Sequence, residues 1–229
     1  MRKIIGSIIM ILGMICILGA GGLVVYNYID SQRAGKASRE ILDKLEQAMD
    51  ERANAAADSQ EDSLSDDLEE AIADPSSGSS AVKAKLFLAM PTEEIDGQRY
   101  IGRLDVPSMN ISLPVMENWD YERLKVSPCR FTGSYYYDDL VICAHNYARH
   151  FSPLKGIGIG VEVNFTTVTG KVYHYKTSNV ETIDPINVKE MTNNVNNDTK
   201  SKSQWDMTLF TCNTGGQTRC AIRCIRSDR

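Results

Sequence analysis

The sequence predicts a mainly β domain, built as an antiparallel barrel or sandwich, behind an N-terminal membrane anchor. From Tyr100 onward, roughly eight short stretches of β-forming residues occupy about 130 residues and are separated by turn signals. An uncharged run from Ile4 to Ile29 precedes them and is long enough to cross a bilayer as a helix. The 229 residues therefore have room for one domain of common size plus extra segments.

The apolar run follows Arg2 and Lys3 and continues past the small residues at 19–22. A cleavable signal peptide usually has a shorter apolar stretch, so we expect residues 1–30 to be a cytoplasmic tip and an uncleaved transmembrane anchor. The two positive residues favour a cytoplasmic N-terminus. The expected localisation is the cell membrane, crossed once, with everything after Tyr28 outside.

Residues 31–82 are predicted to form an acidic helical stalk and linker. Thirteen acidic and five basic residues lie between positions 31 and 80. Ile41, Leu45 and Met49 fall at helical spacing, which indicates one apolar stripe on a spacer helix. A solvated spacer is the simpler interpretation, and self-association or docking on the domain is the alternative. SQEDSLSDDLEE and DPSSGSS then have the composition of linkers.

The expected domain, 83–229, is nearly neutral, with sixteen acidic and eighteen basic residues after position 80. No basic cluster is interleaved with aromatic residues, so the sequence gives no indication of nucleic-acid binding. Short helices are expected in NWDYERLK, HFSPLKG and NVKEMTNNV. Strands are expected in YIGRLDVP, ISLPV, DLVICAHN, VEVNFTTV, KVYHYKTSNVETI, DMTLFTC and TRCAIRCIR.

The last strand shows which side chains should face the core. In TRCAIRCIR, Cys220, Ile222 and Cys224 share one face and are expected to point inward. Arg219 and Arg223 share the other face and are expected to point outward.

A cysteine, a histidine and an arginine lie at strand ends, where a β-scaffold can present them rigidly. Cys212 ends DMTLFTC, His145 leaves DLVICAHN, and Arg219 begins the last strand. A thiolate attacks carbonyls, an imidazole protonates a leaving amine, and a guanidinium holds an oxyanion. The cationic Arg219 would also favour an ionised Cys212. On spacing alone, a packed cysteine and a solvated arginine are the simpler interpretation.

The other cysteines and histidines give weaker signals. Cys143 shares the face of His145 and is a rival nucleophile, although packing is its simpler role. His150 and His174 are expected on the surface. The six cysteines show no disulfide framework, and a pair such as Cys129 with Cys143 stays possible.

We expect no metal and no cofactor. Cys143, His145, Cys212 and Cys220 could in principle bind zinc, but they lack the close ligand pairs of structural zinc sites. The chain also has no glycine-rich phosphate loop after a strand.

Three stretches together resemble the sortase family. TLFTC with Arg219 on the next strand looks like the family's Thr-Leu-x-Thr-Cys signature and its downstream arginine. VICAHNYARHF looks like the histidine segment, and YIGRLDVPSMNISLPV is similar to the opening strands. The resemblance covers about 100–226 and implies an eight-stranded β-barrel with short helices, preceded here by the transmembrane helix and stalk.

Sortases are cysteine transpeptidases, and the resemblance implies a role for each matching residue. Cys212 would attack the Thr-Gly carbonyl of a sorting signal similar to Leu-Pro-x-Thr-Gly and form a thioester. His145 would protonate the leaving amine, and Arg219 would steady the oxyanion, with Arg223 as the alternative arginine. Thr211 and Asn146 would help to bind the substrate. The expected partners are surface proteins with such signals and an amine on cell-wall precursor or on a pilin.

The sequence indicates the sortase subclass less clearly than it indicates the family. His145 and Cys212 are only 67 positions apart, which leaves no room for the long helical insertion of one sortase branch. The amino-acid sequence of SPCRFTGSYYYDDLVICAHNY still resembles that branch, the class B-like sortases, more closely. Asp74-Pro75 is followed by Ser76, so the lid motif of pilin-building sortases is incomplete.

Other functions stay open at this level. The main alternative is a non-catalytic membrane-anchored β-domain that serves as a binding or sensor module. A pilin-polymerising sortase, or a hydrolase that resolves the thioester with water, are further alternatives.

Overall fold

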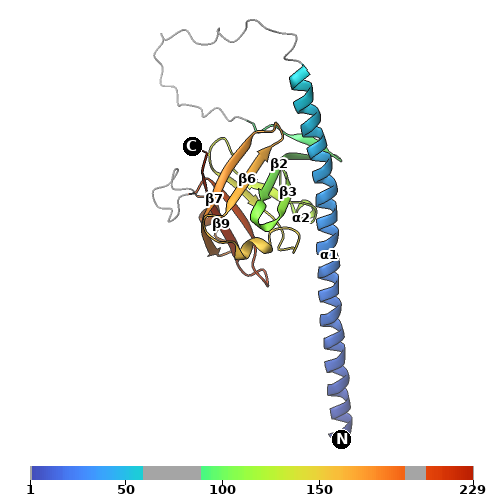
Figure 1. The fold of residues 1–229 in the computed structure, drawn as a ribbon. Coiled ribbons are helices and arrows are strands. Elements are labelled where there is room, and N and C mark those ends of the chain that lie inside the picture. The colour runs from blue at the N-terminus through green and yellow to red at the C-terminus, as the bar shows by residue number, and fades with distance from the viewer. Residues whose placement is uncertain (1, 59–88, 194–204, 229) are drawn as a thin grey trace, which may run out of the picture.

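The structure is a computed structural model that describes residues 2–58, 89–193 and 205–228 (Figure 1). One long N-terminal helix, α1 (Arg2–Asp58), lies along one side of a β-barrel formed by the later part of the chain. The predicted acidic linker falls outside the described residues, so it stays a prediction, as do the expected domain boundaries.

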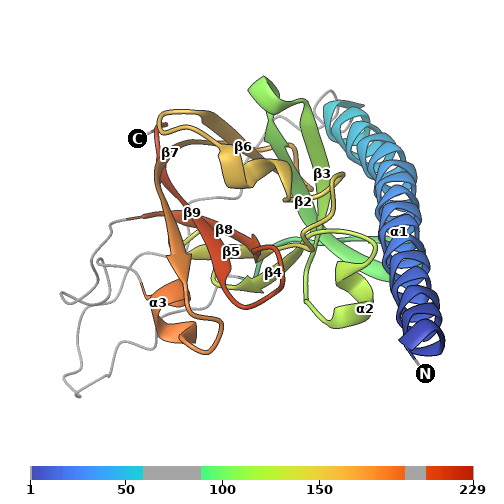
Figure 2. The ribbon, with the colours of Figure 1, turned by 90° about the horizontal axis from the view of Figure 1, so that it is seen from below.

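Within the described residues, eight strands close into a barrel, and a ninth lies at its edge (Figures 1 and 2). The strand order is β1-β2-β3-β4-β5-β8-β9-β7-β6, and the pairing of β2 with β6 closes the ring without β1. The predicted eight-stranded barrel is therefore confirmed. The strands are β1 (Glu93–Ile95), β2 (Gln98–Val106), β3 (Ile111–Met116), β4 (Cys129–Thr132), β5 (Leu140–Cys143), β6 (Glu162–Thr167), β7 (Val172–Ile183), β8 (Met207–Cys212) and β9 (Arg219–Arg226).

Closure of the ring depends on a glycine in β2. The register of β2 shifts between Tyr100 and Gly102, beyond which the strand pairs with both β3 and β6. Gly102 has a φ of 154°, and a Cβ there would lie 2.1 Å from the Thr166 carbonyl oxygen of β6. Only glycine permits this close backbone approach.

Two strand pairs in the ring are parallel, which corrects the expected antiparallel arrangement. β3 pairs parallel with β4, and β5 pairs parallel with β8. Parallel neighbours need a long crossover connection, which local turn signals do not reveal. Because β5 and β8 run in the same direction, their C-terminal ends lie at the same edge of the barrel.

Apolar side chains pack in two layers, one inside the barrel and one outside it. Successive residues alternate between the layers: Ile142 is inside and Cys143 outside, while Leu209 is inside and Phe210 outside. The expected inward set Cys220, Ile222 and Cys224 belongs to the inner layer, so that prediction is confirmed. The outer layer, called the outer cluster below, contains Ile41, Leu45, Ile95, Tyr100, Met116, Leu124, Cys129, Val141, Cys143, Val168, Ile183, Met191, Trp205, Phe210 and Ala221.

The expected short helices are present. α2 (Tyr121–Leu124) and α3 (Val188–Thr192) are capped by Asp120 and Asn187, whose side chains accept backbone N–H groups of the first turn. The 3-10 turn η2 (Pro153–Gly156) lies in the third expected stretch. A further turn, η1 (Pro107–Met109), joins β2 to β3. Among the strands that the structure describes, only β1 and β4 fall outside the stretches expected from the sequence.

α1 changes its surroundings near residue 30. Its first half is apolar enough to cross a membrane, and the most apolar window has no residue buried in the protein. In Figure 1 this half projects away from the barrel. Its second half buries Ser31, Ala34, Ser38, Ile41 and Leu45, a spacing of three or four residues that defines one helix face. The stalk is therefore docked on the domain and is not the solvated spacer that seemed simpler from the sequence.

Ion pairs flank the buried stripe of α1 on the domain side. Lys44 Nζ lies 2.6 Å from Asp96 Oδ2 beyond β1, and Glu46 accepts from Arg103 of β2 at 2.5 Å. The docked half therefore combines apolar packing against β1 and β3 with charged contacts at its edges.

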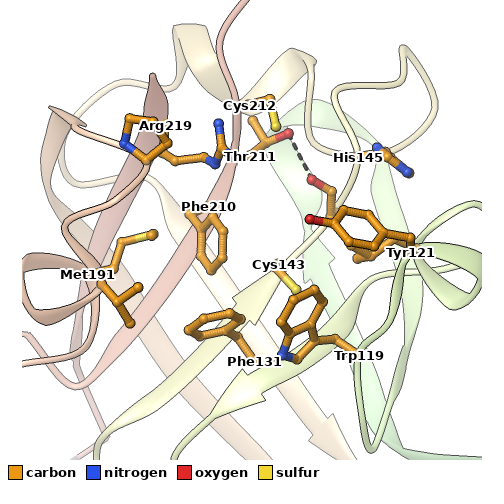
Figure 3. A pocket seen from close by; sticks show the side chains of 14 residues that line it. Trp119, Tyr121, Phe131, Cys143, His145, Met191, Phe210, Thr211, Cys212 and Arg219 are labelled. Atoms are coloured by element: carbon orange, nitrogen blue, oxygen red, sulfur yellow. Dashed lines mark hydrogen bonds between the residues drawn. The ribbon is translucent and has the colours of Figure 1, made fainter. Parts of the chain in front are cut away.

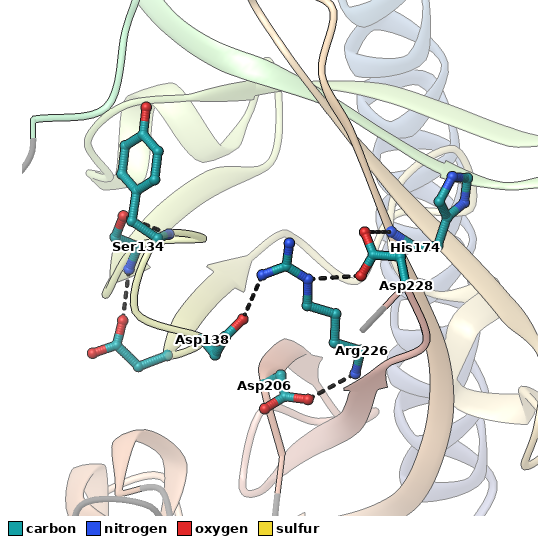
Figure 4. A network of polar contacts seen from close by, with 8 residues as sticks. Ser134, Asp138, His174, Asp206, Arg226 and Asp228 are labelled. Atoms are coloured by element: carbon teal, nitrogen blue, oxygen red, sulfur yellow. Dashed lines mark hydrogen bonds and ion pairs between the residues drawn. The ribbon is translucent and has the colours of Figure 1, made fainter. Parts of the chain in front are cut away.

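A polar network holds the C-terminal end of β9 (Figure 4). The Arg226 guanidinium donates to Asp138 at 2.9 Å and to Asp228 at 2.7 Å, and its backbone N–H donates to Asp206 at 2.7 Å. The network ties β9 to the loop after β4 and to the entry of β8. It is thus a structural tie at the opposite end of β9 from Arg219.

Candidate active site

The parallel pairing of β5 and β8 brings the two expected reactive side chains to one edge of the sheet. Cys143 is the register partner of Phe210, and the Ala144 N–H donates to the Phe210 carbonyl at 3.1 Å. The strand β8 ends at Cys212, and His145 lies two residues beyond the end of β5. Both residues therefore leave the barrel at the same rim.

Thr211 fastens these two strand ends together. Its buried hydroxyl donates to the Ala144 carbonyl at 2.9 Å, the dashed line in Figure 3. This bond joins the residue before Cys212 to the residue before His145. The Thr211 side chain thus links the two strand ends. It also lines the cavity described below, where its expected help in substrate binding stays a prediction.

Arg219 lies across the β8–β9 pair from the cysteine. The two residues are register partners, and Arg219 and His145 lie on opposite sides of Cys212 in Figure 3. Arg219 Nη1 donates to the Gly216 carbonyl at 2.9 Å and to the Thr218 carbonyl at 3.3 Å. These bonds from one nitrogen hold the guanidinium at the rim of the sheet.

Cys212, His145 and Arg219 all line one cavity of about 270 Å³ on the outer side of the barrel. Its apolar floor contains a chain of ring contacts, in which Trp119 lies 5.3 Å from Phe131, and Phe131 lies 5.2 Å from Phe210. Residues of α2 and of the β7–α3 segment form its walls. The cavity is lined by Trp119, Tyr121, Leu124, Phe131, Cys143, Ala144, His145, Pro185, Val188, Met191, Phe210, Thr211, Cys212 and Arg219.

The electrostatic environment of His145 favours a neutral imidazole. Partial burial lowers the pKa of His145 below its ordinary value of 6.5, and the Lys125 ammonium lowers this pKa further. The Asp30 carboxylate of α1 opposes both and raises the pKa. A charged group from the stalk helix therefore acts on this histidine.

Cys143 lies in the same cavity wall but is a packed residue. It is 3% exposed, and its thiol donates to the Cys129 carbonyl at 3.4 Å. Burial raises its pKa far above the usual range for a thiol, which disfavours the thiolate. Cys129 and Cys143 face each other across β4 and β5, and both carry free thiols.

Arg223, the alternative arginine, is engaged elsewhere. Its side chain is 1% exposed and donates to Glu181 at 2.7 Å, to Thr208 at 2.8 Å, and to the carbonyls of Glu190 and Met191. It points out of the barrel as expected, but α3 covers it. Its role is to hold α3, and with it one wall of the cavity.

Three other sequence-based expectations have different outcomes. Asn146 is not among the residues that line the cavity, and within the described chain its buried Oδ1 has no hydrogen-bond partner. His174 is exposed as expected. His150 is fully buried, which corrects the expectation of a surface residue. The docked half of α1 covers His150, and the sequence offered docking of the stalk only as the alternative to a solvated spacer.

Across the described ranges, no group of three or more His, Cys, Asp or Glu residues could hold a metal ion. The four residues considered for zinc are also split between two faces of the sheet. Cys220 belongs to the inner layer, whereas Cys143 belongs to the outer cluster.

A model of the sortase domain matches residues 104–226, which is more than half of the chain. The chain belongs to the sortase family. Sortases are cysteine transpeptidases, so the family match agrees with the resemblance read from TLFTC and the histidine segment. A comparison with curated proteins found no match.

Solved sortase structures are similar to this chain at low sequence identity. Sortase C from Clostridium perfringens SM101 is 21% identical, with 57% of this chain and 71% of that chain covered and a TM-score of 0.45. Sortase A from Corynebacterium diphtheriae is 19% identical, with 58% and 62% covered and a TM-score of 0.47. Sortase C1 from Streptococcus agalactiae is 20% identical, with 59% and 72% covered and a TM-score of 0.49.

Sequence reasoning missed two parts of this site. One is the aromatic floor of Trp119, Phe131 and Phe210, whose members come from separate elements and carry no joint pattern. The other is the contact of α1 with the histidine segment. The run of small residues at Ser31, Ala34 and Ser38 continues the stripe of Ile41 and Leu45 backward, and this continuation was an available signal.

Proposed function

We propose that this sortase is an active, membrane-anchored cysteine transpeptidase. It cleaves a sorting signal similar to Leu-Pro-x-Thr-Gly between Thr and Gly and transfers the acyl group to an amine of cell-wall precursor. The observation that carries the proposal is the single cavity lined by Cys212, His145 and Arg219 in a chain of the sortase family.

The proposed chemistry runs in two half-reactions. The reactive form pairs a Cys212 thiolate with a His145 imidazolium, the proton having passed from the thiol to the ring. The thiolate attacks the Thr carbonyl carbon, and the C–N bond to Gly breaks while the imidazolium gives that proton to the leaving amine. The thioester is then attacked by the acceptor amine, His145 takes up the amine's proton, and the Cys212 thiolate leaves. Arg219 donates to the carbonyl oxygen when it carries negative charge, and the bonds of Nη1 to the β8–β9 turn pre-organise it for that task.

The proposed topology follows from α1. Its first half crosses the membrane once, with Arg2 and Lys3 in the cytoplasm and the barrel outside the cell. Support comes from the length and apolar character of the helix and from the exposure of its side chains in the protein.

Mass spectrometry of the full-length protein in detergent tests the proposal. Incubation with a Leu-Pro-x-Thr-Gly peptide is expected to give an acyl adduct on Cys212, which is lost in Cys212→Ala. The matched control is Cys16→Ala, because Cys16 is an exposed thiol in the apolar half of α1, remote from the cavity. Absence of any adduct on the wild-type protein, across a library of signal peptides, favours the non-catalytic binding module.

Addition of amines separates the transpeptidase from a hydrolase. A ligated product with a glycine-based acceptor supports transfer to cell-wall precursor, and one formed only with a pilin lysine peptide supports pilin polymerisation. Hydrolysis unchanged by either amine contradicts transfer. Arg219→Lys keeps the charge but loses the planar fork, so it should lower kcat while Arg219→Ala lowers it further.

A further inference from the structure

The stalk helix contacts the active-site rim at the segment that carries His145. The Tyr147 hydroxyl donates to Asp30 Oδ2 at 2.5 Å, and the Ala148 N–H donates to Ser31 Oγ at 3.1 Å. Asp30 and Ser31 are the first residues of α1 after its apolar half. The two bonds join residues 117 positions apart and fix the turn directly after His145.

These contacts reach His145 through one aromatic ring. The Tyr147 ring lies 4.8 Å from the His145 ring at an interplanar angle of 35°. Among the residues that the structure describes, none forms a hydrogen bond with a ring nitrogen of His145. Packing against Tyr147 therefore helps to fix the orientation of the imidazole, and the bond to Asp30 helps to fix the orientation of Tyr147.

The rest of the turn is held from two sides. Phe151 and Leu154 are buried in the inner layer of the barrel and anchor its far end. On the other side, α1 approaches so closely that a Cβ on Gly35 would lie 2.6 Å from Arg149 Cβ. The stalk thus supplies one of the two supports of the histidine segment.

We propose that Asp30 and Ser31 are positioning residues of the active site, which hold the His145 imidazole through Tyr147 and the backbone of the turn. The proposal deepens the proposed transpeptidase function and rests on it. One continuous helix then joins the membrane anchor to the proposed acid–base residue. A barrel cut free of α1 lacks this support, so the intact chain is the relevant enzyme.

Several charged or titratable groups surround His145 and define the pH test. Asp30 comes from α1, Lys125 follows α2, Cys212 ends β8, and Tyr147 and His150 belong to the histidine's own segment. The Asp30 charge raises the pKa of His145, so its removal should lower that pKa. Removal of the Lys125 charge should raise it.

Kinetics of the full-length protein in nanodiscs form the first arm of the test. Asp30→Asn and Tyr147→Phe are each expected to lower kcat about 10- to 100-fold with little change in KM, because a misplaced acid–base group slows chemistry more than binding. The double variant should be no slower than the worse single variant, since both changes break the same bond. Asp30→Glu should restore part of the rate.

The matched control is Lys44→Ala, which breaks another contact between α1 and the domain, away from His145. Its kcat should equal that of the wild type. Equal losses in Lys44→Ala and Asp30→Asn, or strictly additive losses in the double variant, would overturn the proposal, because they indicate a general loosening of the helix.

NMR titration of histidine-labelled protein is the second part of the test, and it does not require enzymatic activity. The chain has only three histidines, so the His145 signal can be followed individually. Asp30→Asn should shift the titration of His145 to lower pH and Lys125→Gln should shift it to higher pH. An unchanged His145 titration in Asp30→Asn would sink the positioning role even in an active enzyme. A wild type without any Cys212 adduct but with these shifts would instead contradict only the proposed function.

Discussion

The two halves of α1 share one uninterrupted helix but have opposite surroundings. Before Asp30, apolar side chains cover the helix all round, and Leu12, Leu18 and Leu23 are each at least 61% exposed in the protein. After Asp30, one face is buried on the domain, and Leu45 is fully covered by the outer cluster. Both halves belong to the same unbroken helix. They differ in the pattern of their side chains.

The difference shows how the distribution of apolar side chains around the helix determines which surroundings each half requires. A helix that is apolar on every side needs an apolar medium, whereas a single stripe needs one protein surface. The change takes place at Asp30 and Ser31, which are also the residues bonded to the histidine segment. The change of side-chain pattern thus lies where the helix contacts the histidine segment.

The largest expected effect comes from replacing one leucine by alanine in each half of α1 and comparing the two losses. Leu45→Ala should remove about 2–5 kcal/mol from the free energy that holds the helix on the domain, because a fully buried leucine leaves a cavity. Leu18→Ala, in the exposed half, should change it by less than about 0.5 kcal/mol. Hydrogen–deuterium exchange in nanodiscs measures both, and equal protection of residues 31–49 in the two variants would contradict the docked arrangement.

The next effect depends on pH, because the docked half covers His150. Burial, followed by the charge of His145, lowers the pKa of His150 to about 4. The unfolded chain binds a proton at this residue below about pH 6.5 and the folded chain only near pH 4. Stability should therefore fall as the pH drops through that window, by about 3 kcal/mol in total.

His150→Phe tests this effect, since it keeps an aromatic ring beside Tyr147 but removes the titration. Unfolding midpoints in detergent at pH 7 and pH 5 should differ less in the variant than in the wild type. His174→Phe is the control, because His174 is exposed. The same acid sensitivity in wild type and His150→Phe would show that burial of His150 is not its source.

Local patterns in the sequence were sufficient for seven of the eight barrel strands and placed Cys212 at the end of one of them, whereas its interpretation as a nucleophile needed the family resemblance. Alternation in TRCAIRCIR correctly separated Cys220 and Ile222, which are inside, from Arg219. The turn signals correctly separated most strands. The alternation of inward and outward side chains is set by residues that are neighbours in the sequence, so the sequence alone reveals it.

Features that join distant segments were the ones that local patterns did not reveal. The burial of His150 depends on α1, more than a hundred residues earlier, and the burial of Arg223 depends on α3. The parallel β5–β8 pair likewise needs partners that are far apart in the sequence. These contacts depend on how the elements pack, and no spacing within one segment encodes them.

A smaller effect is expected from replacing one glycine by alanine in each half of α1. Alanine generally stabilises a helix relative to glycine, by up to about 1 kcal/mol. Gly21→Ala should follow this rule, because a Cβ there meets no atom within 4 Å. Gly35→Ala should reverse it and weaken docking by about 1–3 kcal/mol, because the new Cβ would lie 2.6 Å from Arg149 Cβ and Cγ. Protection of the 145–152 segment from hydrogen exchange distinguishes the two, and a gain at both sites would contradict the close approach.

The smallest effect is expected at the exposed ion pair between Lys44 and Asp96. Their side chains are 53% and 62% exposed, so solvent screens the attraction despite the 2.6 Å contact. Lys44→Ala should weaken docking of α1 by no more than about 1 kcal/mol, and added salt should shrink the difference from the wild type further. Hydrogen exchange of residues 31–49 at low and high salt checks this. A loss as large as that of Leu45→Ala would mean that charge, and not the buried stripe, holds the stalk on the barrel. The contrast between the two halves of α1 would then depend on where the charges lie along the helix.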